Sequence, residues 1–194
     1  MNLSLVGLFA SLWLVVGVFI AGKNYPNYNH AKQFLSELGA SGAPTQKLSP
    51  IINNFPLSLL FIAFGIYLLN SIGFNFIGYC IVFHGIGTLV AGVFPMDLDP
   101  YTKIPTVSCK IHSAAGLVMF ISLLAASSFA VFFAGFGFSF KAISIVATLF
   151  TLYFTFKLSK EFPSKGNVGL YQRLSYGCQL IWLSLLSVFL FGAN

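Results

Sequence analysis

The residues that could do chemistry in this sequence are few, and they lie between long apolar stretches. The 194 residues include three histidines and four carboxylates, at Glu37, Asp97, Asp99 and Glu161. Carboxylates and imidazoles together can bind a metal ion or exchange protons in acid–base catalysis. We therefore take Glu37, Asp97 and His112 as candidate catalytic residues.

A second group of polar residues is suited to binding a ligand. Arg173 and His112 could donate hydrogen bonds to a phosphate or carboxylate, and Asn53 and Asn54 could orient it. No HExxH or comparable spacing of metal ligands occurs, so we assign no metal site and leave the cofactor open. The alternative is structural: these side chains pair with one another and cap helix ends.

The elements that must position these residues are membrane-spanning helices. Hydrophobic residues make up 57% of the chain and charged residues 7%, with a mean hydropathy of +0.88. Soluble domains carry roughly 25% charged residues, so this composition excludes a soluble, disordered or nucleic-acid-binding chain. About 20 apolar residues span a bilayer. Six segments qualify: residues 3–22, 51–72, 74–94, 112–136, 140–158 and 174–192. They predict an all-α bundle that forms a single domain over residues 1–194.

The connections between these segments alternate in length, and their charges predict an orientation. The three long connections lie on one side of the membrane, and the two short ones lie with both termini on the other. Lys141 is the only basic residue on the short-loop side, whereas nine lie on the long-loop side: Lys23, Lys32, Lys47, Lys103, Lys110, Lys157, Lys160, Lys165 and Arg173. Cytoplasmic loops are enriched in Lys and Arg. The long loops are therefore expected to be cytoplasmic, with both termini outside the cell (inner or plasma) membrane.

His84 is the one ionisable residue predicted deep in the bilayer. It lies ten residues before Phe94, roughly 15 Å from the interface. An intramembrane histidine suggests proton-coupled transport, and the alternative is a neutral histidine hydrogen-bonded to a neighbouring helix. His30 and His112 belong to the cytoplasmic edge, so neither can share a haem iron with His84.

Two further features concern helix packing and charge. Ser144, Thr148, Thr151 and Thr155 share one face of the fifth segment, which favours packing between helices over a polar conduit. Arg173 lies near the hydrocarbon edge, where an unpaired charge costs several kcal/mol. We therefore expect Arg173 to pair with Asp97 or Glu37, and His112 to line the same pocket.

The order of several short motifs resembles the prokaryotic membrane family known as domain of unknown function 998. The matching residues are Ser36-Glu37-Leu38-Gly39-Ala40, Phe94-Pro95 with Asp97, His112, and Arg173-Leu174 with Trp182. The sequence departs from the pattern at Gln172, where the family often has an acid. The resemblance implies a six-span bundle with these motifs on one face and no established activity. A fainter likeness is to the Frag/DRAM/Sfk six-span group, some of whose members handle lipids or GPI anchors.

Four functions remain open at this stage. The first is binding or handling of a lipid or other anionic amphiphile in a cytoplasmic-face pocket formed by Asn53, Asn54, His112 and Arg173. The second is a small intramembrane hydrolase or transferase, with or without a metal. The third is proton-coupled transport through His84, and the fourth is an accessory subunit without chemistry. Membrane lipids are the expected partners, nucleic acid is not, and the oligomeric state is left open.

The charge asymmetry predicts the position of the C-terminus. A reporter fused after Asn194 should behave as extracytoplasmic, because the nine basic residues hold the long loops inside the cell. Paired alkaline phosphatase and fluorescent protein fusions measure this directly. Fluorescence from the C-terminal fusion without phosphatase activity would contradict the predicted topology.

Overall fold

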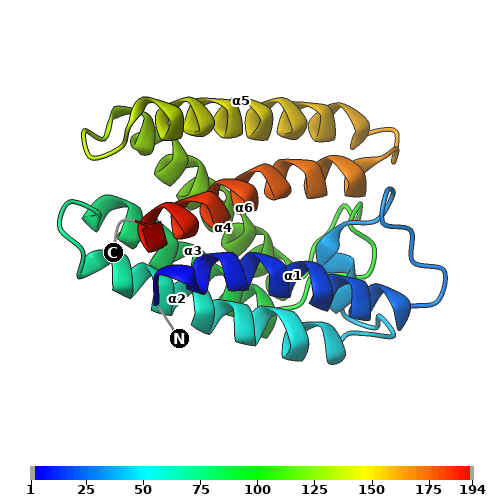
Figure 1. Cartoon of the computed structure of the whole chain (residues 1–194). Helices are drawn as coiled ribbons and strands as arrows, with labels where there is room; N and C mark the ends of the chain where they lie inside the picture. Colours follow the sequence, from blue (N-terminus) through cyan, green and yellow to red (C-terminus); the bar gives the residue numbers. More distant parts are fainter. Residues whose placement is uncertain (1–2, 193–194) are drawn as a thin grey trace.

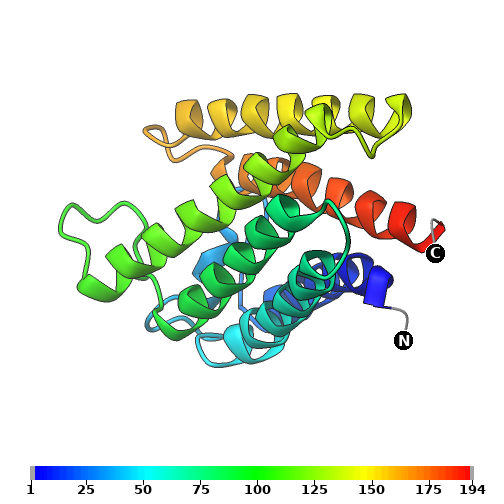
Figure 2. The same cartoon turned by 90° about the vertical axis from the view of Figure 1, so that its left-hand side faces the viewer.

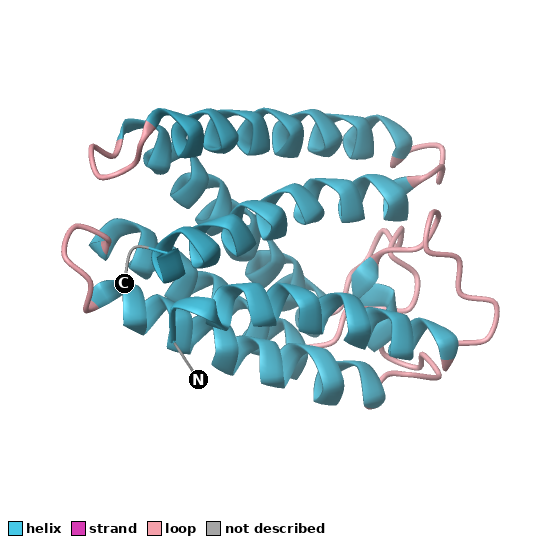
Figure 3. Ribbon diagram, in the orientation of Figure 1, coloured by secondary structure: helices cyan, strands magenta, loops and turns pink. Residues whose placement is uncertain are grey.

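The computed structural model describes residues 3–192 and contains helices and loops, with no strand in that range (Figure 1, Figure 3). Six of its helices are long and apolar enough to cross a membrane. They are α1 (Val6–Lys23), α2 (Phe55–Leu69), α3 (Asn75–Val93), α4 (Val107–Phe132), α5 (Phe138–Glu161) and α6 (Val168–Gly192). The all-α prediction is therefore confirmed. A 3-10 turn over Leu3–Leu5 precedes α1, and a π-helical turn over Pro50–Asn54 precedes α2.

Helices α4, α5 and α6 begin earlier than their apolar segments predict, and the difference is largest for α4 and α6. The side chain of Thr106 accepts a hydrogen bond from the Cys109 amide and caps α4, which therefore starts at Val107. Helix α6 likewise begins at Val168, before the apolar segment that starts at residue 174. As a result His112 and Arg173 lie inside these helices and not at their first residues. Hydropathy locates the hydrocarbon-crossing part of a helix, whereas capping and backbone geometry decide where the helix begins.

Helices α2 and α3 pack most closely, and glycines allow that approach. A Cβ atom built on Gly85 would lie 2.7 Å from the Ile62 side chain and 2.9 Å from the Ile62 amide nitrogen. Gly65 and Gly78 meet the partner helix in the same way. Between membrane helices, small residues stabilise the contact because they let the two backbones approach and increase van der Waals packing.

Hydroxyl groups and aromatic rings connect α5 to its neighbours. The buried Trp182 indole nitrogen donates to the Ser144 hydroxyl at 2.9 Å, and Thr155 shares a 2.8 Å hydrogen bond with Ser175. Thr148 reaches Ser127 of α4 at 3.0 Å. These bonds confirm that the Ser/Thr face of the fifth segment serves helix packing.

His84 is fully buried and joins three helices. Its Nδ1 lies 3.0 Å from the Met119 carbonyl of α4, and its Nε2 lies 2.9 Å from the Tyr176 hydroxyl of α6. A carbonyl can only accept, so Nδ1 carries a proton, and on a neutral ring Tyr176 donates to Nε2. The ring edge also packs on Phe61 at a centroid distance of 4.6 Å. These contacts fix the relative positions of α3, α4 and α6.

The long and short connections separate to opposite ends of the bundle (Figure 1). Residues 24–49, 94–106 and 162–167 form the long-loop end. Residues 70–74 and 133–137 form the short-loop end, together with the start of α1 and the end of α6. The first long loop contains a 3-10 helix, η2 (Leu35–Gly39), that folds back against the bundle. The candidate catalytic and binding residues all belong to the long-loop end.

The glycine contact between α2 and α3 generates a stability prediction. Gly85→Ala should lower the free energy of unfolding by about 1–3 kcal/mol, because the added methyl group overlaps the backbone of α2. Thermal unfolding in mild detergent measures the change. Gly177→Ala is the control, since a Cβ on Gly177 meets nothing within 4 Å. Equal melting temperatures for the two variants would rule out close α2–α3 packing at Gly85.

Candidate ligand-binding cavity

A cavity of about 530 Å³ lies at the long-loop end of the bundle. Helices α4 and α5 meet near the loop that joins them and diverge toward their other ends (Figure 2). The cavity is lined by the diverging parts of α4 and α5, by the first half of α6, and by η2 and the π-helical turn. It therefore occupies the space that the divergence of α4 leaves within the bundle.

The walls of the cavity are mostly apolar, and one side is open. Leu14, Leu57, Met119, Phe120 and Leu158 contribute apolar side chains. Ser113 and Gly116 also line the cavity, yet both are exposed on the surface of α4. These two exposed residues mark the α4 side as a part of the cavity that is accessible from outside the protein core.

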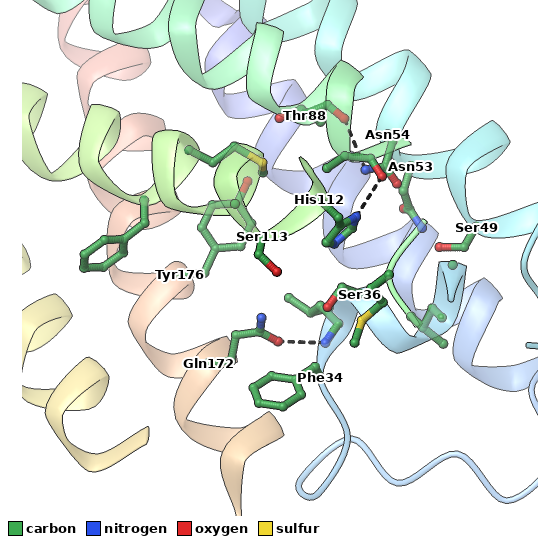
Figure 4. A pocket seen from close by; sticks show the side chains of 18 of the residues that line it. Phe34, Ser36, Ser49, Asn53, Asn54, Thr88, His112, Ser113, Gln172 and Tyr176 are labelled. Carbon is green, nitrogen blue, oxygen red and sulfur yellow. Dashed lines mark hydrogen bonds between the residues drawn. The ribbon is translucent and has the colours of Figure 1, made fainter. Parts of the chain in front are cut away.

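His112 is one of the polar groups that gather at the loop end of the cavity (Figure 4). Its Nδ1 lies 3.1 Å from the Ala91 carbonyl and 2.8 Å from the Phe94 carbonyl. Both partners are acceptors, so Nδ1 carries the proton. On the neutral ring Nε2 is then an acceptor, and it has no hydrogen-bond partner within residues 3–192.

Asn53 and Asn54 line the cavity from the π-helical turn that precedes α2. The Asn54 amide donates to the Thr88 carbonyl at 3.3 Å. Asn53 is only 5% exposed, and its Oδ1 atom has no hydrogen-bond partner in the described part of the chain. This oxygen lies against Gly17 of α1, where a larger residue could not fit. The oxygen is therefore buried against α1 and is not open to the cavity.

Arg173 does not line the cavity, and the expected ion pair with Asp97 or Glu37 is absent between the described residues. Its Nη1 donates to three carbonyls, those of His30 at 2.6 Å, Gln33 at 2.8 Å and Gly169 at 3.0 Å. Its Nη2 donates to the Tyr28 hydroxyl at 2.6 Å. The prediction of a carboxylate partner was wrong, because backbone carbonyls and the Tyr28 hydroxyl bind the two terminal nitrogens instead. Nε is also buried and has no hydrogen-bond partner among the described residues.

The loop that Arg173 holds is attached at several more points. The Leu170 amide donates to the Ala31 carbonyl at 2.8 Å, and the Leu35 amide donates to Gln172 Oε1 at 2.7 Å. Burial raises the pKa of Tyr28, against the opposing effect of Arg173, so its phenol remains neutral and donates to the Phe34 carbonyl at 2.7 Å. Residues 28–35 are thereby held to α6, and η2, which follows them, forms one wall of the cavity.

The two candidate carboxylates are occupied with local structure. Glu37 is buried, and its oxygens accept from the Phe34 amide at 2.7 Å and the Gln33 side chain at 3.0 Å. Asp97 accepts from the Thr106 hydroxyl at 2.6 Å and amide at 2.9 Å, and these bonds lower the pKa of Asp97. Neither residue lines the cavity with His112, so the candidate catalytic group is not brought together. Within residues 3–192, no cluster of three or more His, Cys, Asp or Glu side chains is arranged to hold a metal.

Sequence reasoning missed several polar residues of the cavity. Ser36, Ser49, Gln172 and Tyr176 line it beside the predicted Asn53, Asn54 and His112. Ser36 lies in the Ser-Glu-Leu-Gly-Ala motif, and Gln172 marks the departure from the family pattern, so the motif comparison could have identified both as candidate site residues. The Gln172 oxygen accepts the Leu35 amide, a role that a carboxylate oxygen could also fill.

Comparison with known proteins identifies the family of the chain. A family model described as "Protein of unknown function (DUF998)" matches residues 8–189, so the chain belongs to this family and the resemblance noted from its motifs is confirmed. Searches of curated proteins and of solved structures gave no significant match.

The hydrogen bonds of Arg173 generate a prediction about the first loop. Arg173→Lys keeps the charge but lacks the planar fork that reaches several carbonyls, so residues 28–38 should detach from α6 more often. Hydrogen–deuterium exchange of peptides from this loop should quicken by about tenfold or more, since bonds to a charged group contribute about 1.5–3 kcal/mol each. Lys47→Ala, an exposed change in the same loop, is the control. Unchanged exchange in Arg173→Lys would show that the loop is held by other contacts.

Proposed function

We propose that this member of the DUF998 family binds a lipid-like amphiphile in the cavity, with its apolar chain between α4 and the α5–α6 pair and its head group at the long-loop end. The observation that carries the proposal is the cavity itself, of about 530 Å³. Small-molecule sites have volumes of roughly 300–1,000 Å³ and combine apolar walls with a few polar groups. The cavity has both features.

The energetics of packing support a bound molecule. Protein interiors are close-packed, and an unfilled space within a bundle loses the van der Waals contacts that its lining could make. Elsewhere the helices meet through glycines such as Gly85 without a gap, so the sequence is capable of tight packing. A cavity of this size between membrane helices is best explained by an occupant, and the bilayer supplies amphiphiles to the accessible α4 side, beside Ser113 and Gly116.

The placement of the polar groups supports the same orientation. Ser36, Asn53 and His112 lie at the loop end, and apolar side chains such as Phe120 line the part nearer the centre of the bundle. An amphiphile in this cavity would keep its head group at the depth of the membrane interface. On the topology expected from charge, that interface is the cytoplasmic one of the cell membrane.

The alternative functions have less support from the described residues. A hydrolase or transferase using Glu37, Asp97 and His112 would need these groups near one reacting atom, but only His112 lines the cavity. Proton transport through His84 would need polar groups leading from the ring to both ends of the bundle, whereas the partners of the ring are one backbone carbonyl and the Tyr176 hydroxyl. Binding without covalent chemistry therefore accounts for more of the geometry.

A variant that fills the cavity tests the proposal. Gly116→Phe should place a ring in the cavity without displacing a neighbour, because a Cβ on Gly116 meets nothing within 4 Å. Protein purified from membranes in mild detergent is extracted, and its lipids are quantified by mass spectrometry per mole of protein. We expect the amount of the enriched amphiphile to fall about tenfold, equivalent to about 1.4 kcal/mol in binding.

The matched control is Gly177→Phe, an equally open helical position that does not line the cavity. It should retain the bound amphiphile at the wild-type level, and both variants should melt near the wild-type temperature. If wild type, Gly116→Phe and Gly177→Phe all carry the same lipids in the same amounts, the cavity does not bind an amphiphile.

A further inference from the structure

We infer that the cavity selects an amphiphile with an uncharged head group that donates hydrogen bonds through hydroxyls, of the monoacylglycerol or long-chain alcohol type. This inference rests on the proposed function and specifies its ligand. It replaces the anionic head group expected from the sequence, which depended on Arg173 as a donor.

The charge of the cavity lining carries the first step. No Lys, Arg, Asp or Glu of residues 3–192 lines the cavity. Arg173 follows the lining residue Gln172, but its two terminal nitrogens bond to residues 28–33 and Gly169. Burying a phosphate or carboxylate without a positive partner is costly. An anionic head group would therefore bind weakly here.

A positively charged head group is disfavoured for the complementary reason. Among residues 3–192, no carboxylate lines the cavity to neutralise an ammonium ion. The chain carries a net charge of +6, and nine of its ten basic residues belong to the long-loop side where the head group would lie. Like charges at that surface repel a cation, although salt weakens the effect. The lining is therefore suited to a neutral head group.

The hydrogen-bonding capacity of the lining indicates which neutral groups fit. Nε2 of His112 has no hydrogen-bond partner among residues 3–192 and accepts a hydrogen bond when the ring is neutral, so a ligand hydroxyl can donate to it. Ser36 and Ser49 add hydroxyls that can donate or accept, and both point toward the same space (Figure 4). A hydroxyl-bearing head group supplies donors and acceptors together, whereas an ester or ether alone supplies only acceptors.

A matched series of ligands with one acyl or alkyl chain tests this inference. Binding of 1-monooleoylglycerol, oleate, 1-oleoyl-lysophosphatidate and oleylamine to purified, delipidated protein is compared in one buffer. Monooleoylglycerol should bind about tenfold or more tightly than each charged ligand, a difference of about 1.4 kcal/mol. Equal or tighter binding of oleate, lysophosphatidate or oleylamine would overturn the neutral head group and leave the proposed function standing. Failure of all four ligands to bind would overturn the proposed function as well.

A substitution at Ser36 separates binding from folding. Ser36→Ala removes a cavity-lining hydroxyl that has no hydrogen-bond partner among residues 3–192, so the melting temperature of the ligand-free protein should stay the same. Its affinity for monooleoylglycerol should fall about tenfold relative to the wild type. Ser41→Ala, an exposed change in the same loop and outside the cavity lining, is the matched control and should keep wild-type affinity. Wild-type affinity in a Ser36→Ala protein that folds normally would contradict the role of this hydroxyl.

Discussion

The guanidinium of Arg173 is the interaction on which the long-loop end depends. An arginine at the edge of the hydrocarbon is costly unless its donors are satisfied, and here four acceptors surround its terminal nitrogens. Two of these acceptors are carbonyls in the first long loop and a third is the Tyr28 hydroxyl. The loop is therefore folded onto α6 in one defined position, and η2, which forms a cavity wall, is placed with it. The charge of Arg173 thus positions the first loop, while no Lys, Arg, Asp or Glu of residues 3–192 lines the cavity.

The rest of the bundle follows from how closely each pair of helices can approach. Gly85 brings α2 against α3, and Gly87 admits the Met119 side chain and the Ala115 carbonyl of α4. Helix α4 thus follows α3 along its length, while its contact with α5 is concentrated near their common loop (Figure 2). His84 reinforces this geometry by joining α3 to both α4 and α6. The divergence of α4 from α5 is the direct cause of the cavity.

Much of the fold could be predicted from the sequence, because six long apolar runs admit few other structures in a membrane. Asn53, Asn54 and His112 were also identified as residues of one pocket, since they flank those runs on the same side. The partner of Arg173 could not be predicted, because backbone carbonyls leave no mark in a sequence. Glu37 and Asp97 illustrate a related limit: residue type does not distinguish a catalytic carboxylate from one that caps a turn, which was the stated structural alternative.

Photolabelling tests the central claim, that an amphiphile occupies the cavity beneath the first loop. The probe is a monoacylglycerol with a diazirine in its acyl chain, applied to the protein in lipid nanodiscs, with labelled residues located by peptide mass spectrometry. The account predicts labels on α4 and α6 residues that line the cavity, such as Phe120 and Tyr176, and competition by excess unlabelled monooleoylglycerol. Labels confined to outward-facing residues such as Val15 of α1 and Leu149 of α5, without competition, would contradict it.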